Sequence, residues 1–277
     1  LNDYKTQSEE SQIKRLIKIS DPEKDKKTLF IWPEGIFYQS YLKDIKNYKK
    51  LFKDKFSKNH LIILGINNFA NDHETNKQKY YNSLVVLNNE LEILSLYNKV
   101  NLVPFGEFLP FEKILSKFGL KKITQGYNSF SPGVKREIIN LGNDFNEKLI
   151  LPLICYEIIY PAKIKKKNQY PDLIINISED AWFGKSIGPH QHFTKAIYRS
   201  IEEGVFTARS ANKGISAFIN PNGKTLKSLY TGEAGNIELN FPHFSKLTLF
   251  SKYGNKIFLL IILLYIFLFL IFKKFKI

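Results

Sequence analysis

Short apolar runs bounded by polar turns alternate along the chain with longer segments of helical periodicity. Runs of about four to eight β-branched and aromatic residues predict buried strands, here at Thr28–Trp32, Leu61–Ile66, Ser83–Leu87, Leu149–Cys155, Leu173–Ile177 and Ile215–Ile219. Apolar positions three or four apart predict helices, at Ser11–Ile19, Phe37–Phe52 and Gln191–Ala211. The last of these has an apolar face formed by Phe193, Ile197, Ile201, Val205 and Ala208.

Two turn sequences predict hairpins within this pattern. Asn88-Asn89-Glu90 separates the run Ser83–Leu87 from a second strand at Leu91–Leu96. Pro221-Asn222-Gly223 is a tight turn between two further strands. The alternation of strands and helices predicts one mixed α/β domain of roughly 250 residues, which we place at residues 1–250.

The C-terminal segment has a different pattern from the rest. Ile257 to Phe272 contains no charge, glycine or proline, and lysines flank it on both sides. Sixteen residues span roughly 24 Å as a helix, and flanking lysines can extend that reach towards a ~30 Å hydrocarbon core. The alternative is a buried core helix, which usually has some polar positions. We expect a membrane span at 257–272, with the lysine-rich end cytoplasmic and residues 1–250 on the other side.

Composition excludes several classes of protein. The 277 residues carry 41 basic and 26 acidic side chains, a net charge of +15, yet only four of the basic residues are arginine. Because the lysines are scattered along the chain, they favour a surface near anionic lipid over a nucleic-acid interface. A single cysteine excludes an intrachain disulfide and a multi-cysteine metal site. The polar N-terminal segment contains no signal peptide. Because the chain begins at Leu1 and has no methionine, we expect a fragment or a processed product.

Two candidate reactive residues lie where apolar runs end. Cys155 follows the apolar run from Leu149 to Ile154, where a sharp turn can present a nucleophile at the edge of a sheet. Glu34 follows Pro33 at the end of the first predicted strand, a position suited to a cleft. Their alternatives are an ordinary buried cysteine and a glutamate on a surface loop.

Lys99 and Glu107 lie in a segment dense in aromatic residues, proline and glycine. A lone lysine in this lysine-rich chain is usually a surface residue, but Leu102, Val103 and Phe105 are expected to draw the segment into the core. A buried ammonium requires a carboxylate, and Glu107 is the obvious partner.

A glutamate, a lysine and a cysteine together suit acyl transfer at a thiol. The carboxylate accepts the thiol proton, the ammonium stabilises the oxyanion and the thiolate attacks. His190 and His192 are two positions apart and have no nearby cysteine, so a zinc site is not expected, and no metal or cofactor is implied.

Several motifs resemble the nitrilase-like domain of the bacterial apolipoprotein N-acyltransferase family, within the carbon–nitrogen hydrolase superfamily. They are WPE (32–34), YNKVNLVPFGEFLP (97–110), LICYE (153–157), SEDAWFGKSIGPHQH (178–192) and the segment 196–224. The resemblance runs from about residue 28 to the C-terminus. It implies an αββα sandwich followed by one transmembrane helix, with the family's N-terminal membrane helices and its first nitrilase strand absent from the sequence. Glu179 and Asn101 stand where the family has asparagine and, frequently, histidine.

The resemblance also implies roles for individual residues. Glu34 becomes the general base, Lys99 the oxyanion-stabilising residue and Cys155 the nucleophile; Glu107, Tyr156 and Glu157 become supporting residues of the active site. The family transfers an acyl chain from a membrane phospholipid, through a thioester, to the α-amino group of an apolipoprotein's diacylglyceryl-cysteine. The implied location is the inner membrane, with the catalytic domain periplasmic, and we expect a monomer.

Apolar residues around the site suggest a lid that dips into the bilayer. The candidates are Phe105, Phe108, Trp182 and Phe183, with Gly184 as a hinge. For Trp182 and Phe183, packing in the core is the alternative. Two other functions remain open: a nitrilase-type amidase that uses the same three residues with water as acceptor, and an inactive membrane-anchored remnant. The transferase hypothesis requires Glu34, Lys99 and Cys155 to converge in one pocket, on the side of the domain where the C-terminal helix begins.

Overall fold

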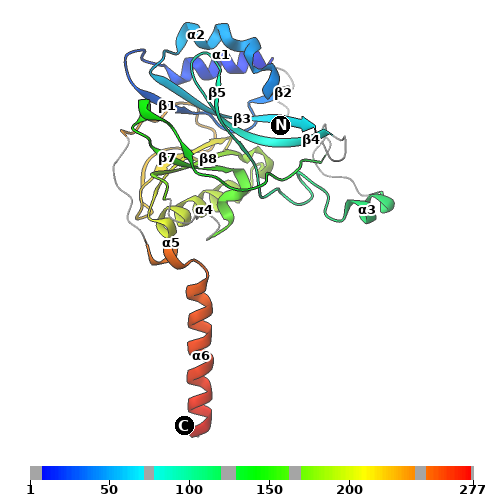
Figure 1. Ribbon diagram of the computed structural model, residues 1–277, viewed down its shortest axis with the longest axis vertical. Helices are drawn as coiled ribbons and strands as arrows, with labels where there is room; N and C mark the ends of the chain where they lie inside the picture. The colour runs from blue at the N-terminus through cyan, green and yellow to red at the C-terminus, as the bar shows by residue number, and fades with distance from the viewer. Residues whose placement is uncertain (1–7, 72–77, 120–128, 162–169, 241–247, 276–277) are drawn as a thin grey trace.

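The structure, a computed structural model, describes residues 8–71, 78–119, 129–161, 170–240 and 248–275. Two sheets organise this part of the chain (Figure 1). The first has the order β1-β3-β4-β5, with β2 also paired to β3. Its strands are β1 (Thr28–Ile31), β2 (Phe37–Tyr41), β3 (His60–Asn71), β4 (Gln78–Leu87) and β5 (Ile93–Asn98). The second has the order β11-β10-β9-β8-β7-β6. Its strands are β6 (Ile139–Asn140), β7 (Leu149–Ile154), β8 (Leu173–Glu179), β9 (Phe206–Asn212), β10 (Ser216–Ile219) and β11 (Thr225–Leu229).

Helices cover the outer faces of both sheets. The α-helices are α1 (Glu9–Ser20), α2 (Lys49–Lys55), α3 (Glu112–Leu115), α4 (Gly188–Glu203), α5 (Leu249–Tyr253) and α6 (Lys256–Phe275). The 3₁₀ turns are η2 (Leu42–Tyr48), η3 (Ser116–Phe118), η4 (Asn143–Phe145), η5 (Cys155–Ile159) and η6 (Asp180–Phe183). In Figure 1, α1 and α2 lie above the first sheet, and α4 lies below the second.

Alternating side chains divide the core into three layers. On β3, Ile62 and Leu64 pack with α1 and α2, whereas Leu61 and Ile63 face the second sheet. The strands of the second sheet alternate in the same way, with Ile175 facing the first sheet and Ile174 packing in the layer that includes Ala196 of α4. This period of two is what a strand buried on both faces requires. The expected αββα sandwich is therefore confirmed, as are the hairpin between β4 and β5 and the turn between β10 and β11.

Two of the predicted helices are wrong in part. The segment Phe37–Phe52 begins as strand β2, continues as η2, and becomes helical only at α2. Strand β2 pairs with β3, and the buried carboxylate of Glu9 accepts the backbone N–H groups of Gln39 and Ser40, so the segment's polar groups are satisfied without a helix.

The helix predicted at Gln191–Ala211 is displaced towards the N-terminus. It runs from Gly188 to Glu203 and is closed by Gly204, whose φ of 68° is a conformation that favours glycine. The residues that follow form β9, which pairs with the open edge of β8, so Ala208 packs between the sheets. An apolar spacing of four residues does not distinguish a longer helix from a helix followed by a strand.

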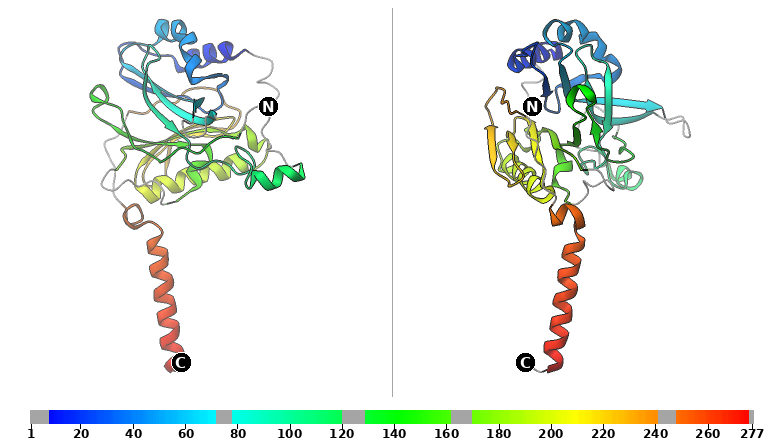
Figure 2. Two further views of the ribbon diagram at one scale, coloured as in Figure 1. Left: turned by 45° about the vertical axis from the view of Figure 1, so that its right-hand side comes forward. Right: turned by 60° about the vertical axis from the view of Figure 1, so that its left-hand side comes forward.

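Helix α6 projects from the domain as a separate rod (Figures 1 and 2). Its segment Lys256–Lys274 is long and apolar enough to cross a membrane, and none of it is buried against the rest of the chain. The alternative of a buried core helix is therefore wrong.

Candidate active site

Glu34 follows β1 and is held by both sheets. Its Oε1 accepts a hydrogen bond from Asn82 Nδ2 at 2.6 Å, and its Oε2 accepts one from the backbone N–H of Glu179 at 3.0 Å. Asn82 lies on β4 and Glu179 ends β8, so the carboxylate joins the two halves of the sandwich. The alternative of an unattached surface glutamate is wrong.

Lys99 follows β5, and its side chain is only 1% exposed. Its backbone N–H donates to Asn82 O at 2.9 Å, and its Nζ donates to Glu107 Oε1 at 2.9 Å. Glu107 Oε2 in turn accepts the backbone N–H of Val103 at 2.8 Å. The buried pair expected from the sequence is therefore confirmed, and the surface alternative for Lys99 is wrong.

Asn82 joins the two carboxylates of the site, and no local pattern in the sequence predicted it there. Its Nδ2 donates both to Glu34 and, at 2.9 Å, to Glu107 Oε1, so one side-chain amide joins the two carboxylates. The hairpin around residues 88–90 offered a signal, because its register pairs Ser83 with Asn98 and so places Asn82 beside Lys99.

Cys155 lies immediately after β7, where it begins η5. Its φ is 48°, a left-handed conformation that a residue with a Cβ rarely adopts. Burial and the charge of Glu34 raise the pKa of its thiol to about 12, while the charge of Lys99 and a hydrogen bond with Ser178 oppose this shift. The thiol is thus protonated at neutral pH, and a nearby base is needed to form a thiolate.

The pKa values of Glu34, Lys99 and Cys155 depend on one another's charges. Burial raises the pKa of Glu34, the positive charge of Lys99 opposes this, and the charge of Glu107 adds to it. Burial alone would lower the pKa of Lys99, but the charges of Glu107, Glu34 and Cys155 raise it. The lysine therefore remains an ammonium, which can stabilise negative charge but cannot act as a base.

Glu157 connects the cysteine turn to the lysine segment. Its fully buried carboxylate accepts the backbone N–H groups of Val100, Asn101 and Ile154, each at 3.0 Å. Two side chains complete its surroundings: Tyr97 donates to it at 2.8 Å and Arg136 at 3.1 Å. Arg136 also donates to Asn101 Oδ1 at 3.0 Å, so the side chain of Asn101 is held beside this carboxylate. Tyr156, the predicted neighbour of the thiol, is half-buried and packs edge-on against Tyr160.

Glu179 shapes the loop behind Glu34. Its side chain accepts hydrogen bonds from Ala181 N and Asn212 Nδ2. A Cβ on Gly35 would lie only 2.3 Å from Glu179 Oε2, and Gly35 has a φ of 84°, so both the space and the backbone conformation there favour glycine. Burial raises the pKa of Glu179 to about 8, and the charges of Glu34 and Asp180 add to this shift.

The four predicted lid residues are not equally exposed. Phe105 is 47% exposed, Trp182 53% and Phe183 38%, whereas Phe108 is half-buried. The expectation that Phe105 packs into the core is therefore wrong, as is the core alternative for Trp182 and Phe183. Phe105 has a φ of 62°, a left-handed conformation that a residue with a Cβ rarely adopts.

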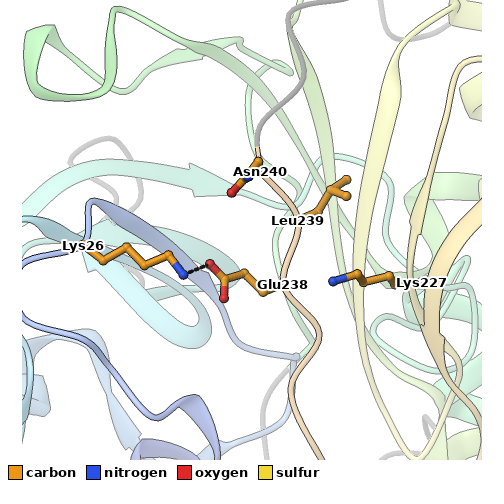
Figure 3. A pocket seen from close by; sticks show the side chains of 5 residues that line it. All are labelled: Lys26, Lys227, Glu238, Leu239 and Asn240. Atoms are coloured by element: carbon orange, nitrogen blue, oxygen red, sulfur yellow. Dashed lines mark ion pairs between the residues drawn. The ribbon is translucent and has the colours of Figure 1, made fainter.

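A surface hollow of about 350 Å³ lies away from these residues (Figure 3). It is lined by Lys26, Lys227, Glu238, Leu239 and Asn240, and Lys26 forms an ion pair with Glu238. None of these side chains is a nucleophile beside a base, so the hollow offers no competing catalytic site. Across the described ranges, no cluster of three or more His, Cys, Asp and Glu side chains could hold a metal ion.

The chain is similar in sequence to several known proteins. A sequence profile described as carbon–nitrogen hydrolase matches residues 20–238. An apolipoprotein N-acyltransferase from Bradyrhizobium diazoefficiens is 34% identical over 229 residues, which are 82% of this chain and 42% of that protein. One from Caulobacter vibrioides is 34% identical over 246 residues, covering 85% of this chain and 45% of that protein. The resemblance in sequence is confirmed, and the chain spans less than half the length of these curated relatives.

Solved structures support the fold alone. A mutant of the amidase from Nesterenkonia sp. AN1, with an acetamide moiety covalently added at its active-site cysteine, has a TM-score of 0.54 and 15% identity, covering 81% of each chain. Another mutant of this amidase, in complex with butyramide, has a TM-score of 0.51 and 14% identity, covering 81% of this chain and 82% of the other.

Proposed function

This chain belongs to the carbon–nitrogen hydrolase family, and from that premise we propose that it carries the catalytic site of an apolipoprotein N-acyltransferase. The donor is a membrane phospholipid, and the acceptor is the N-terminal diacylglyceryl-cysteine of an apolipoprotein. The observation that carries the proposal is the bonded chain Glu34–Asn82–Glu107–Lys99, in which the charges of Glu34 and Lys99 act on the thiol of Cys155. No metal or organic cofactor takes part.

In the first half-reaction the acyl chain moves to the enzyme. Glu34 accepts the proton of Cys155 Sγ, and the thiolate attacks the ester carbonyl carbon of the phospholipid. The carbonyl oxygen becomes an oxyanion beside Lys99 Nζ. When this intermediate collapses, the bond from the carbonyl carbon to the glycerol oxygen breaks, Glu34 returns its proton to that oxygen, and a lysophospholipid leaves a thioester on Cys155.

In the second half-reaction the acyl chain moves to the acceptor. The free α-amino group attacks the thioester carbonyl carbon, and Glu34 accepts a proton from the nitrogen. A C–N bond forms and the C–S bond breaks, after which the proton returns to Sγ and the thiol is restored. Because the first product leaves before the acceptor binds, the kinetics should be ping-pong.

The position of the apolar loops supports a lipid substrate. The loop with Phe105 leads into α3, and the loop with Trp182 and Phe183 leads into α4. Figure 2 (left) shows α3 and α4 at the end of the domain from which α6 leaves. With residues 257–272 spanning the inner membrane and the domain periplasmic, these exposed side chains would face the bilayer that supplies the donor.

The decisive experiment is intact-mass analysis of the chain after incubation with phosphatidylethanolamine vesicles. We expect one added acyl mass, located on Cys155 by peptide mapping and absent in Cys155→Ala. Addition of an apolipoprotein peptide with a diacylglyceryl-cysteine should remove the acyl group from Cys155, and the peptide should gain it.

The other two functions predict different results. Hydrolysis of butyramide without any acyl adduct from phospholipid would favour the amidase, and no reaction with either substrate would favour an inactive remnant. Either result would overturn the transferase proposal.

A further inference from the structure

A buried charged cluster lies behind the cysteine turn and has no part in the mechanism above. It consists of Asp180, His192 and Arg209, none of them more than 4% exposed. Arg209 Nη2 donates to Asp180 Oδ2 at 2.7 Å, and Ser178 Oγ donates to Asp180 Oδ1 at 2.7 Å. The three residues come from η6, α4 and β9, and Ser178 comes from β8, so the cluster links four elements of the second half of the chain.

One member of the cluster reaches the backbone of the candidate nucleophile. His192 Nε2 lies 3.2 Å from the carbonyl oxygen of Cys155. A left-handed conformation such as the φ of 48° at Cys155 persists only where the surroundings hold it. A hydrogen bond to the carbonyl fixes the plane of the peptide that joins residues 155 and 156, because that peptide is rigid.

The surroundings of the imidazole indicate where its proton lies. Burial and the charge of Arg209 lower the pKa of His192, although Asp180 opposes this, so the ring carries one proton at neutral pH. Nδ1 lies 2.9 Å from Asp180 Oδ1, an acceptor, and 3.2 Å from Arg209 Nη2, a donor whose hydrogen an unprotonated Nδ1 accepts. Nε2 faces the carbonyl of Cys155 and has to supply the hydrogen itself.

We propose that His192 is a positioning residue whose Nε2–H donates to the Cys155 carbonyl and keeps the nucleophile turn in its left-handed conformation. Asp180 and Arg209 hold the ring in place for this bond. The same ring packs against the exposed Phe183, at 5.5 Å between ring centroids. His192 therefore contacts both Phe183 and the backbone of Cys155. This inference rests on the proposed role of Cys155 as nucleophile.

A matched pair of variants tests the bond. In His192→Gln the amide nitrogen can occupy the place of Nε2, whereas in His192→Asn the shorter side chain reaches only the place of Nδ1. Both lose the ring contact with Phe183, so this loss cancels in the comparison. His190→Asn, at an exposed position of the same helix, is the control.

The main readout is the rate of acyl-adduct formation on Cys155 with phosphatidylethanolamine vesicles. We expect a loss of roughly tenfold to a hundredfold in His192→Asn, with unchanged half-saturation by lipid, and rates near wild type in His192→Gln and His190→Asn. Thermal unfolding of all variants identifies any loss that comes from misfolding. Equal rates in the Gln and Asn variants, after both are shown to be folded, would overturn the inference.

A second readout does not depend on catalysis. In ¹⁵N-histidine-labelled chain in detergent micelles, Nε2 of His192 should be the nitrogen that carries the hydrogen, and its signal should be the one missing from His192→Gln. A hydrogen on Nδ1 alone would overturn the inference and leave the transferase proposal intact. Conversely, a wild-type chain with no acyl adduct but the expected Nε2–H would overturn only the transferase proposal.

Discussion

Lys99 Nζ donates to Glu107 Oε1 at 2.9 Å, in a place where the lysine side chain is 1% exposed and the glutamate 11%. A buried ammonium of this kind is stable only with its carboxylate, and removal of one partner of such a pair typically costs about 3–5 kcal/mol. The pair thus holds a positive charge at a fixed position at neutral pH, and that charge acts on the thiol of Cys155.

Lys99→Arg should therefore not be a conservative change. A planar guanidinium presents its charge differently from a compact ammonium and is too large for the space between Glu107 and the oxyanion. Loss of an oxyanion donor typically costs ~10²–10³ in rate, and we expect a loss of that size in acyl-adduct formation on Cys155. Lys224→Arg, at an exposed position, is the control. Adduct formation at the wild-type rate in Lys99→Arg would contradict the assigned role.

Asn82→Asp should slow acyl-adduct formation on Cys155, although aspartate and asparagine have nearly the same shape. The amide that donates to Glu34 and Glu107 becomes a third carboxylate between them, and a like charge raises the pKa of Glu34 further. The base is then ionised in a smaller fraction of molecules at neutral pH. The rate of adduct formation against pH should move about one unit or more towards alkaline pH. Asn68→Asp, on β3, is the control, and an unmoved profile in Asn82→Asp would argue against Glu34 as the base.

Glu157→Gln should lower the stability of the whole fold. Five donors converge on this carboxylate; the amide would point an N–H at some of them and would remove the negative charge beside Arg136. We expect a loss of about 3–5 kcal/mol in the free energy of unfolding, measured by denaturant titration. Glu92→Gln, an exposed carboxylate in the turn before β5, should change it little. Equal stability of the two variants would show that Glu157 does not hold the turn.

Glu179 should make stability depend on pH. Its pKa is about 8 in the folded protein and 4.5 as the ordinary value, so the folded state retains a proton that the unfolded chain loses. This group's stabilising contribution is complete below about pH 4.5 and declines as the pH rises towards 8.

The comparison with Glu179→Gln isolates that contribution, because glutamine does not titrate. The free energy of unfolding of the wild type minus that of Glu179→Gln should decline between about pH 5 and pH 8. A difference that stays constant, or increases with pH, would mean that Glu179 is ionised in the folded protein.

Some of the site could be predicted because its signals are local. Lys99 and Glu107 are eight positions apart in an apolar segment, and Cys155 directly follows an apolar strand, so neighbouring residues alone indicated their burial and position. Asn82, Glu179 and His192 were not assigned to the site, because each contacts residues distant in the chain. The hydrogen bond between Glu179 and Glu34, for example, joins residues 145 positions apart.

The sequence by itself determined most of the alternation of strands and helices, the apolar C-terminal helix and the choice of candidate reactive residues. These follow from hydrophobic periodicity and side-chain chemistry, which act over a few neighbouring residues. Only the tertiary structure decided that Phe37–Tyr41 is a strand, because its backbone groups bond to β3 and to the distant carboxylate of Glu9. It likewise decided that the helix at α4 ends at Glu203, because the residues that follow pair with β8 as strand β9. It also decided that one asparagine joins two carboxylates and that a histidine faces the cysteine carbonyl. Such contacts depend on how the two sheets stack, and that stacking is a property of the whole packed core.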